Sequence, residues 1–204
     1  MSRPVLITCG GTRNPVDAIR YLSAAATGLT GIGMAKALRE QGREVHMLAS
    51  VEASLRAPEL TAEVYGSTRD LLARMRTWCE AHLDGVVIHS AAVGDYEFAG
   101  AVGKIPSGQG ELVLRLTPTP KIVDEILKWA PGTWLVSFKA GRPGIPAAEL
   151  EAVARAQAVR TGSAWVFANA LDHTRTDVLL VGAERSERFG DRREAVASLL
   201  ERVP

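Results

Sequence analysis

The chain has 204 residues, 47% of them hydrophobic, and its 24 lysine and arginine residues nearly balance 23 aspartate and glutamate residues. A net charge of +1 gives no overall field that would attract nucleic acid or an anionic membrane, so we expect neither partner. Cys9 and Cys79 lack the spacing of a metal site or a disulfide framework, and we expect no protein-held metal. The first apolar run is too short to span a membrane, which favours one cytoplasmic domain over residues 1–204.

Six short apolar runs are typical of β-strands, and helical patterns separate most of them. The strands are predicted at residues 5–9, 44–49, 85–89, 133–138, 164–168 and 178–181. The helices are predicted at residues 32–40, 68–82, 120–129, 147–159 and 192–202. This alternation predicts an α/β fold, in which a Rossmann-like, doubly wound and mostly parallel sheet carries helices on both faces.

Two segments interrupt the alternation. Residues 10–30 place about 20 mostly small and polar residues between the first strand and its helix, where a crossover needs only a handful. A loop of this length is typical of a functional site. Residues 99–110 are rich in glycine, and apolar and polar residues alternate over residues 111–116. This second pattern predicts a mobile flap joined to an extra strand.

Ligands of open α/β sheets bind at the carboxyl ends of the strands, so residues that follow strands are candidates. Gly10 and Gly11 follow the first strand, where they favour either a phosphate cradle with Thr12 as a hydroxyl donor or an ordinary tight turn. Residues 27–33 open the first helix and resemble the glycine fingerprint of dinucleotide folds, with phosphate over the helix start. No acidic residue ends the second strand, so a nicotinamide-dependent oxidoreductase is the weaker interpretation.

Other polar residues follow later strands or lie in the predicted flap. Asp95 can accept a hydrogen bond from a ribose or base or assist Mg²⁺, and the alternative is a turn or helix cap. Lys104 can bring positive charge to a phosphate from the flap, and the alternative is an ordinary surface lysine. Lys139 and Asn169 are equally ambiguous, whereas His89, at the end of an apolar strand, is expected to be a hydrogen-bonded structural residue.

Several motifs that occur in register make a family recognisable. Ile-Thr-x-Gly-Gly-Thr-Arg-x-Pro-x-Asp-x-x-Arg-Tyr at residues 7–21 is followed by Ala-Ala-Val-x-Asp-Tyr at residues 91–96. These motifs resemble the phosphopantothenoylcysteine synthetase family of coenzyme A biosynthesis, with further agreement at residues 104–105, 120–123, 138–139 and 167–169. The resemblance covers nearly the whole chain and is greatest to the stand-alone bacterial form, which lacks the fused flavin-dependent decarboxylase domain.

The resemblance implies a ligase that activates 4′-phosphopantothenate with CTP or ATP, in the presence of Mg²⁺, and couples the acyl nucleotidylate to cysteine. It implies that Lys104 is the catalytic residue of the flap. The implied nucleotide-binding residues are Gly10, Gly11, Thr12, Gly28, Ala91, Asp95, Lys104, Pro120, Lys121, Ile122, Val123, Phe138 and Arg160, and the implied substrate-binding residues are Arg20, Ser23, Ala24 and Ala92. It also implies a homodimer in which the flap or its hairpin reaches the neighbouring subunit, and the apolar residues 112–114 suit such pairing.

The chain departs from the family pattern at two positions. Ala24 replaces an asparagine that helps the family bind and resolve the acyl nucleotidylate, and Ala156 replaces a lysine four residues before Arg160. The loss of one polar contact to a reacting intermediate costs about 2.7–4 kcal/mol, or roughly a hundred- to a thousandfold in rate. A nucleotide-binding homologue that acts on a different acid, or that has no catalytic activity, is therefore the alternative to the synthetase.

Overall fold

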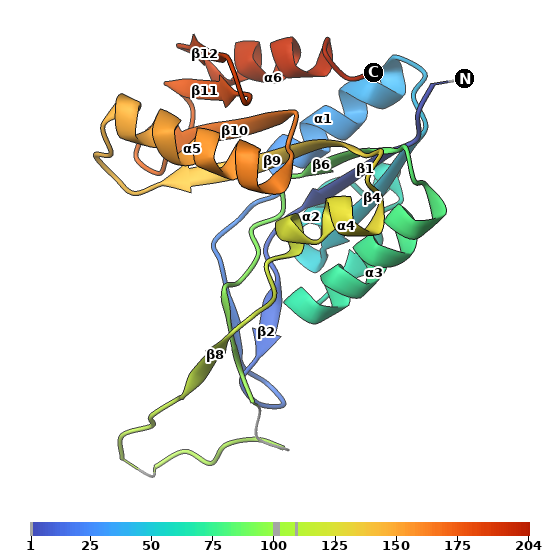
Figure 1. The fold of residues 1–204 in the computed structure, drawn as a ribbon. Coiled ribbons are helices and arrows are strands. Elements are labelled where there is room, and N and C mark those ends of the chain that lie inside the picture. Colours follow the sequence, from blue (N-terminus) through green and yellow to red (C-terminus); the bar gives the residue numbers. More distant parts are fainter. Residues whose placement is uncertain (1, 100–102, 109) are drawn as a thin grey trace.

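The computed structural model describes residues 2–99, 103–108 and 110–204, and it has a large sheet flanked by helices (Figure 1). The strands of this sheet are β1 (Val5–Cys9), β4 (Val45–Ser50), β5 (Glu63–Tyr65), β6 (Val86–His89), β9 (Trp134–Gly141), β10 (Trp165–Ala170), β11 (Val178–Val181) and β12 (Ser186–Phe189). The helices are α1 (Leu29–Glu40), α2 (Val51–Arg56), α3 (Thr68–Ala81), α4 (Ile126–Trp129), α5 (Ala147–Thr161) and α6 (Arg192–Leu200). None of these helices is long and apolar enough to cross a membrane.

The eight strands lie in the order β12-β11-β10-β9-β6-β1-β4-β5. The six strands from β10 to β5 are parallel, whereas β11 and β12 form an antiparallel edge. From β1 the chain first builds outward through β4 to β5, and it then builds β6, β9 and β10 on the other side of β1. This is the strand order of dinucleotide-binding folds, with its reversal between β1 and β6. The predicted fold class is confirmed.

Buried side chains attach helices to both faces of the sheet. Successive strand residues point to opposite faces, so Leu6 and Ile7 of β1 belong to different clusters. Ile7 packs in a cluster with residues of α1 and α6, among them Leu38 and Leu199. Leu6 shares the opposite cluster with residues of α3 and α4, including Leu71. A smaller cluster joins α5 to β10 and β11, so helices cover both faces as predicted.

The prediction of an extra strand at residues 111–116 is wrong for most of its length. Residues 111–115 are irregular, and the strand β8 covers Leu116–Pro118 instead. It pairs antiparallel with β7 (Tyr96–Phe98), which offers only three residues. The alternating residues before β8 therefore have no strand partner among the described residues, and alternation without a partner does not make a strand.

Other differences concern short or tightened elements. The helix predicted at residues 120–129 divides into a 3-10 turn, Ile122–Asp124, and the short helix α4. The amide of Glu125 donates to the Ile122 carbonyl at 3.0 Å, a three-residue step that tightens the chain and interrupts the α-helix. The elements α2, β5 and β12 were not predicted, because three to six residues are too few to show a clear period.

An arm extends from the sheet (Figure 1). We define this arm as the described residues of 13–23 and 96–118; it contains the hairpin of β2 (Arg13–Pro15) and β3 (Tyr21–Ser23) and the β7–β8 pair. Asn14 joins the arm to the body, since its side chain donates to the Tyr96 carbonyl and accepts from the Thr68 amide, both at 2.8 Å. The long loop predicted at residues 10–30 therefore contains a hairpin, while residues 100–102 and 109 of the predicted flap lie outside the described residues.

Helix α1 packs directly on β1 through Gly31. A Cβ atom at this position would lie 2.5 Å from Cys9 Cβ and 2.8 Å from Ser90 Oγ. A Cβ atom at Gly33, two residues later in the same helix, would meet no heavy atom within 4 Å. The close approach of α1 to β1 therefore requires glycine at position 31 but not at position 33.

We predict that Gly31→Ala lowers the free energy of unfolding by about 1–3 kcal/mol, because the added methyl group overpacks the helix against the sheet. Gly33→Ala is the matched control and should raise the free energy of unfolding by about 0.4–1 kcal/mol, since alanine restricts the unfolded chain. Urea unfolding of both variants and the parent measures the two effects. Stabilisation by both substitutions would contradict the close approach at Gly31.

His89 ends β6 in an enclosed position. Its Nδ1 lies 2.8 Å from Thr8 Oγ1, which also accepts the amide of Ala91 at 3.2 Å. With that acceptor site in use, the Thr8 hydroxyl can donate its proton to Nδ1 of a neutral imidazole. Burial lowers the pKa of His89 to about 4, which keeps the ring neutral at neutral pH. The geometry agrees with the expected structural role.

We predict that acid destabilises the fold through His89. As the pH falls from 6.5 to about 4, the unfolded chain binds a proton at His89 that the folded chain does not, so stability is lost across this window. The pKa difference corresponds to a loss of about 3 kcal/mol by pH 4. His89→Asn should remove this part of the pH dependence in urea unfolding. An unchanged slope in His89→Asn would refute the argument.

Candidate active site

A cavity of about 850 Å³ opens at the carboxyl edge of the sheet, where β1 and β6 end. The order of the strands reverses at this point, so the connections from the two strands diverge and leave a crevice. The volume lies within the range of about 300–1,000 Å³ that is usual for small-molecule sites. The predicted site residues that line the cavity are Gly10, Gly28, Ala91, Ala92, Asp95, Lys121, Ile122, Val123, Phe138 and Arg160.

Two glycines let the backbone form one wall of the cavity. Gly10 has a φ of +90°, and a Cβ atom there would overlap the side chain of Ser50. Gly28 has a φ of +75°, and a Cβ atom there would lie 2.6 Å from Ala53 Cβ. Both positions therefore need glycine for conformation and for space. The backbone that they expose is suited to close contact with a ligand.

Helix α1 begins at this wall, where the Leu29 amide donates to Thr27 Oγ1 at 3.5 Å. Its N-cap residue Gly28 makes no side-chain cap hydrogen bond, and no acidic residue lies in the first turn. Leu29, Thr30 and Gly31 all line the cavity. Because the first amides of a helix have no partner within the helix, this end of α1 can bind an anion.

Gly11 and Thr12 hold the wall together but do not line the cavity. Thr12 is buried; its Oγ1 accepts the amide of Gly94 at 2.8 Å and lies 3.1 Å from Thr68 Oγ1. Gly11 forms a β-bridge with Ala92. The two residues therefore tie the loop after β1 to the loop after β6, and Thr12 has no hydroxyl facing the cavity.

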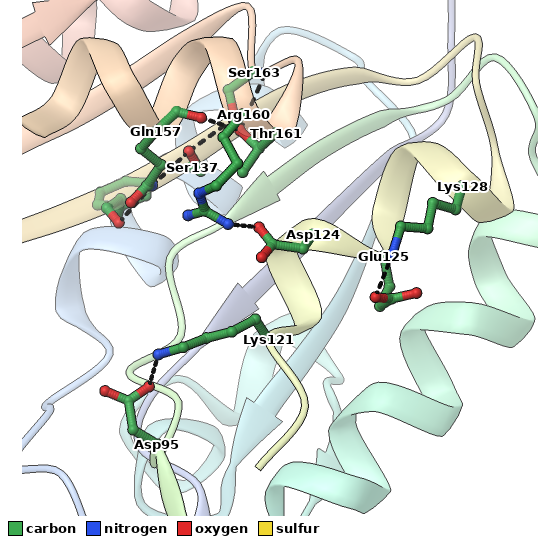
Figure 2. Close-up of polar contacts among 11 residues, drawn as sticks. Asp95, Lys121, Asp124, Glu125, Lys128, Ser137, Gln157, Arg160, Thr161 and Ser163 are labelled. Carbon is green, nitrogen blue, oxygen red and sulfur yellow. Dashed lines mark hydrogen bonds and ion pairs between the residues drawn. The ribbon is translucent and has the colours of Figure 1, made fainter. Parts of the chain in front are cut away.

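The opposite wall carries two ion pairs (Figure 2). Lys121 Nζ lies 2.5 Å from Asp95 Oδ1, and the Arg160 guanidinium pairs with Asp124 of the 3-10 turn. Lys121, Asp95 and Arg160 line the cavity, whereas Pro120, which begins this segment, does not. The pairs hold two cations and one carboxylate at the cavity surface, where they can exchange partners with a charged ligand.

A buried network fixes the position of Phe138. Gln157 Nε2 donates to Ser137 Oγ at 2.9 Å and to the Phe138 carbonyl at 3.2 Å, and Ser137 Oγ lies 2.8 Å from Ser163 Oγ (Figure 2). The Phe138 ring stacks on Phe167, with centroids 4.9 Å apart. The network therefore holds the backbone of Phe138, and the stack holds its ring.

Lys104 does not line the cavity of its own chain. The turn at the tip of the β2–β3 hairpin holds both of its neighbours, since Ala18 donates its amide to the Gly103 carbonyl at 3.1 Å and Ile105 donates to Asp17 Oδ2 at 3.0 Å. The Lys104 side chain is exposed between these two contacts. The arm therefore fixes the backbone on both sides of Lys104 and leaves the ammonium group accessible.

The predicted substrate-binding residues Arg20, Ser23 and Ala24 also lie outside the cavity. Arg20 pairs with Asp17 at 2.7 Å and so belongs to the turn that holds the Lys104 segment. Ser23 Oγ donates to the Ala24 carbonyl at 3.2 Å. The next residue, Ala25, does line the cavity, so Ala24 stands at the point where the hairpin enters the cavity wall.

The cavity is also lined by residues that were not predicted from the sequence. They include Ser137, Gln157, Thr174, Arg175 and Arg192. Thr174 and Arg175 follow the carboxyl end of β10, and this position after a predicted strand is the feature of the sequence that could have indicated them. Gln157 lies within α5, and Arg192 is the first residue of α6. No local motif marks either, because tertiary packing alone brings these helices to the cavity.

Comparisons of sequence relate this chain to known proteins. The family model of the DNA/pantothenate metabolism flavoprotein C-terminal domain matches residues 1–190. The coenzyme A biosynthesis bifunctional protein CoaBC of Thermococcus kodakarensis is 35% identical over 189 residues, covering 91% of this chain and 46% of the relative. The Methanocaldococcus jannaschii protein of the same name is 27% identical over 136 residues, covering 67% of this chain and 33% of the relative. This chain therefore spans about half the length, or less, of these curated relatives.

Solved structures share the fold. The DNA/pantothenate metabolism flavoprotein from Streptococcus pneumoniae superposes with a TM-score of 0.86 at 24% identity, covering 99% of this chain and 98% of that one. A Cab2 mutant in complex with phosphopantothenate-cysteine has a TM-score of 0.75 at 17% identity, covering 98% of this chain and 86% of that one. Together with the matched family model, these likenesses show that the chain belongs to the DNA/pantothenate metabolism flavoprotein C-terminal domain family, the phosphopantothenoylcysteine synthetase family indicated by its motifs.

Proposed function

We propose that this domain is a phosphopantothenate–cysteine ligase, which activates 4′-phosphopantothenate with CTP or ATP and couples it to cysteine. The observation that carries the proposal is one cavity lined by six separate segments that match the nucleotide-binding motifs of the family. The names of the relatives refer to coenzyme A biosynthesis, and one structural neighbour holds phosphopantothenate-cysteine, which supports this substrate class.

The proposed reaction has two steps. A carboxylate oxygen of the acid attacks the α-phosphorus of the nucleotide, so that an acyl–phosphate bond forms and pyrophosphate leaves. The amine of cysteine then attacks the acyl carbon, the nucleoside monophosphate leaves, and the nitrogen loses a proton as the amide forms. Because the first step brings two anions together, positioning and charge neutralisation are its main requirements.

The cavity supplies both requirements. The backbone at Gly10 and Gly28 can approach the phosphates closely, and the start of α1 adds amides that have no partner within the helix. Lys121 and Arg160 bring positive charge to the opposite wall. Asp95 can accept a hydrogen bond from a ribose or base once the nucleotide draws Lys121 toward its phosphates.

The described residues do not build a cage for Mg²⁺. They contain no group of three or more His, Cys, Asp or Glu side chains that could hold a metal, and Asp95 is the only carboxylate lining the cavity. In this proposal Mg²⁺ is the counter-ion of the nucleotide co-substrate, and no step depends on a protein-held metal.

Two features of the arm bear on the proposed role of Lys104 in the reaction. Lys104 lies outside its own cavity, and the arm exposes large apolar side chains, among them Tyr96, Leu112 and Val113, of which Val113 is 72% exposed. Exposed apolar residues on a projecting segment favour contact with another chain. We therefore propose a homodimer in which the arm of one subunit brings Lys104 to the phosphates in the cavity of the other.

We predict that Lys104→Ala reduces pyrophosphate release by at least about a hundredfold, since it removes a charge that stabilises the transition state. Pyrophosphate release with 4′-phosphopantothenate, Mg²⁺ and either CTP or ATP measures this loss. Lys128→Ala, at an exposed residue of α4, is the control and should retain the parent's rate. Full turnover by Lys104→Ala would remove Lys104 from the mechanism, and no release by the parent with either nucleotide would favour a different acid or a non-catalytic homologue.

The same assay tests the arrangement between subunits. A Lys104→Ala chain keeps an intact cavity. An Arg160→Ala chain keeps an intact arm, and we expect it to be inactive because it loses a cation that lines the cavity. If Lys104 acts in the neighbouring subunit, a mixture of the two inactive chains regains part of the activity through mixed dimers. A mixture that exchanges subunits but remains inactive would contradict the proposed arrangement.

Because alanine occupies position 24, we expect this chain to convert the acyl nucleotidylate slowly. Its methyl group cannot make the hydrogen bond that an asparagine would offer to the acyl nucleotidylate, and its neighbour Ala25 lines the cavity. The structure also places Ala24 against the loop after β1, since a Cβ atom at Gly11 would lie 2.6 Å from the Ala24 carbonyl oxygen. Position 24 therefore adjoins the wall of the proposed site without lining the cavity itself.

We predict that Ala24→Asn accelerates amide formation by roughly 10- to 100-fold, because it restores a polar contact to the intermediate. Mass spectrometry of quenched reactions should show less accumulated acyl nucleotidylate than in the parent. Ala24→Leu is the matched control, since leucine has nearly the shape of asparagine without its hydrogen-bonding groups. Equal rates in all three proteins would show that another group already performs this task.

A further inference from the structure

Arg192 lies in the cavity wall, and uncharged groups hold its guanidinium in place. Its Nη1 donates to Asn169 Oδ1 at 3.0 Å and to the Thr174 carbonyl at 2.9 Å, while Nε and Nη2 donate to Thr30 Oγ1 at 3.2 and 3.1 Å. The Arg192 guanidinium carbon lies 4.8 Å from the centroid of the Phe167 ring. Every hydrogen-bond acceptor that the described residues offer to this guanidinium is therefore uncharged.

The residues that line the cavity carry an excess of positive charge. Its charged lining residues are Asp95, Lys121, Lys139, Arg160, Arg175 and Arg192. Asp95 and Arg160 each have an ion-pair partner. Lys139, Arg175 and Arg192 have none within the described part of the chain. Burial lowers the pKa of Arg192 below its usual value.

Arg192 also touches the N-terminal end of α1. Thr30, which accepts from two nitrogens of Arg192, is the second residue of that helix. The first turn of α1 and the guanidinium therefore meet at one point of the cavity wall. An unneutralised cation and a helix N-terminus are separate features, and each favours an anion at that point.

We propose that Arg192 and the first turn of α1 form a subsite for a phosphoryl group. The proposal rests on the proposed function, because both a nucleoside triphosphate and 4′-phosphopantothenate carry phosphate. Four of the five guanidinium N–H groups donate to Asn169, Thr174 and Thr30, which leaves one N–H of Nη2 to donate a charge-assisted hydrogen bond to a phosphate oxygen. The contacts with Asn169, Thr174 and Phe167 hold the side chain in place, so little rotamer freedom is lost when phosphate binds.

The test compares ligands that differ only in phosphate, by titration calorimetry. The pairs are CTP with cytidine, ATP with adenosine, and 4′-phosphopantothenate with pantothenate, and inorganic pyrophosphate is a separate probe. Arg192→Gln should weaken the binding of one phosphorylated ligand by about 10- to 100-fold, as expected for a lost charge-assisted hydrogen bond. It should leave the unphosphorylated partner unaffected. Arg193→Gln, at the exposed neighbour in α6, is the matched control for net charge.

Each outcome decides the proposal. A selective loss for a nucleotide assigns the subsite to its phosphate chain, and a selective loss for 4′-phosphopantothenate assigns it to that phosphate. No loss, or an equal loss for phosphorylated and unphosphorylated ligands, would overturn the subsite and leave Arg192 a structural role. If the parent binds neither substrate, the proposed function fails, and the binding of pyrophosphate alone tests the subsite. Weaker pyrophosphate binding by Arg192→Gln but not by Arg193→Gln supports the subsite, and any other result overturns it.

Discussion

The reversal of strand order between β1 and β6 determines where this protein can bind a ligand. The chain leaves these neighbouring strands in opposite directions, so neither connection covers the gap at their carboxyl ends. Backbone hydrogen bonds join the two loops across the gap, with the Ala92 amide 2.9 Å from the Gly10 carbonyl. Such close contact requires small residues, and those residues in turn leave the backbone exposed to the cavity.

Positive charge is concentrated at the cavity, although the chain as a whole is nearly neutral. The chain carries a net charge of only +1, yet lysine and arginine greatly outnumber carboxylates among the lining residues. The two ion pairs of one wall can exchange their carboxylates for ligand phosphates. Arg192, on the side of α1 and α6, has no carboxylate to exchange. Phosphate bound there would complete an interaction that the folded chain leaves incomplete.

The arm is a second structural unit with its own support. The turn at Asp17 fixes the Lys104 segment through the Ala18 amide and the Asp17 carboxylate, and Asn14 attaches the arm to the body. The proposed nucleotide-binding cavity and the predicted catalytic lysine therefore lie in different parts of the subunit. An enzyme built in this way gains a complete site only when the arm meets a cavity, which links activity to assembly in the proposed dimer.

The sequence by itself determined the α/β class, the parallel strands, the helices on both faces and the glycine loops, because hydrophobic period and turn chemistry are local properties. Tertiary structure alone decided which side chains share the cavity. It buried Thr12 between two loops, kept Lys104 in the arm, and brought Arg192 to Thr30 across 162 positions of sequence. Strand order and helix packing set such meetings, and these depend on contacts between distant segments that no local pattern records.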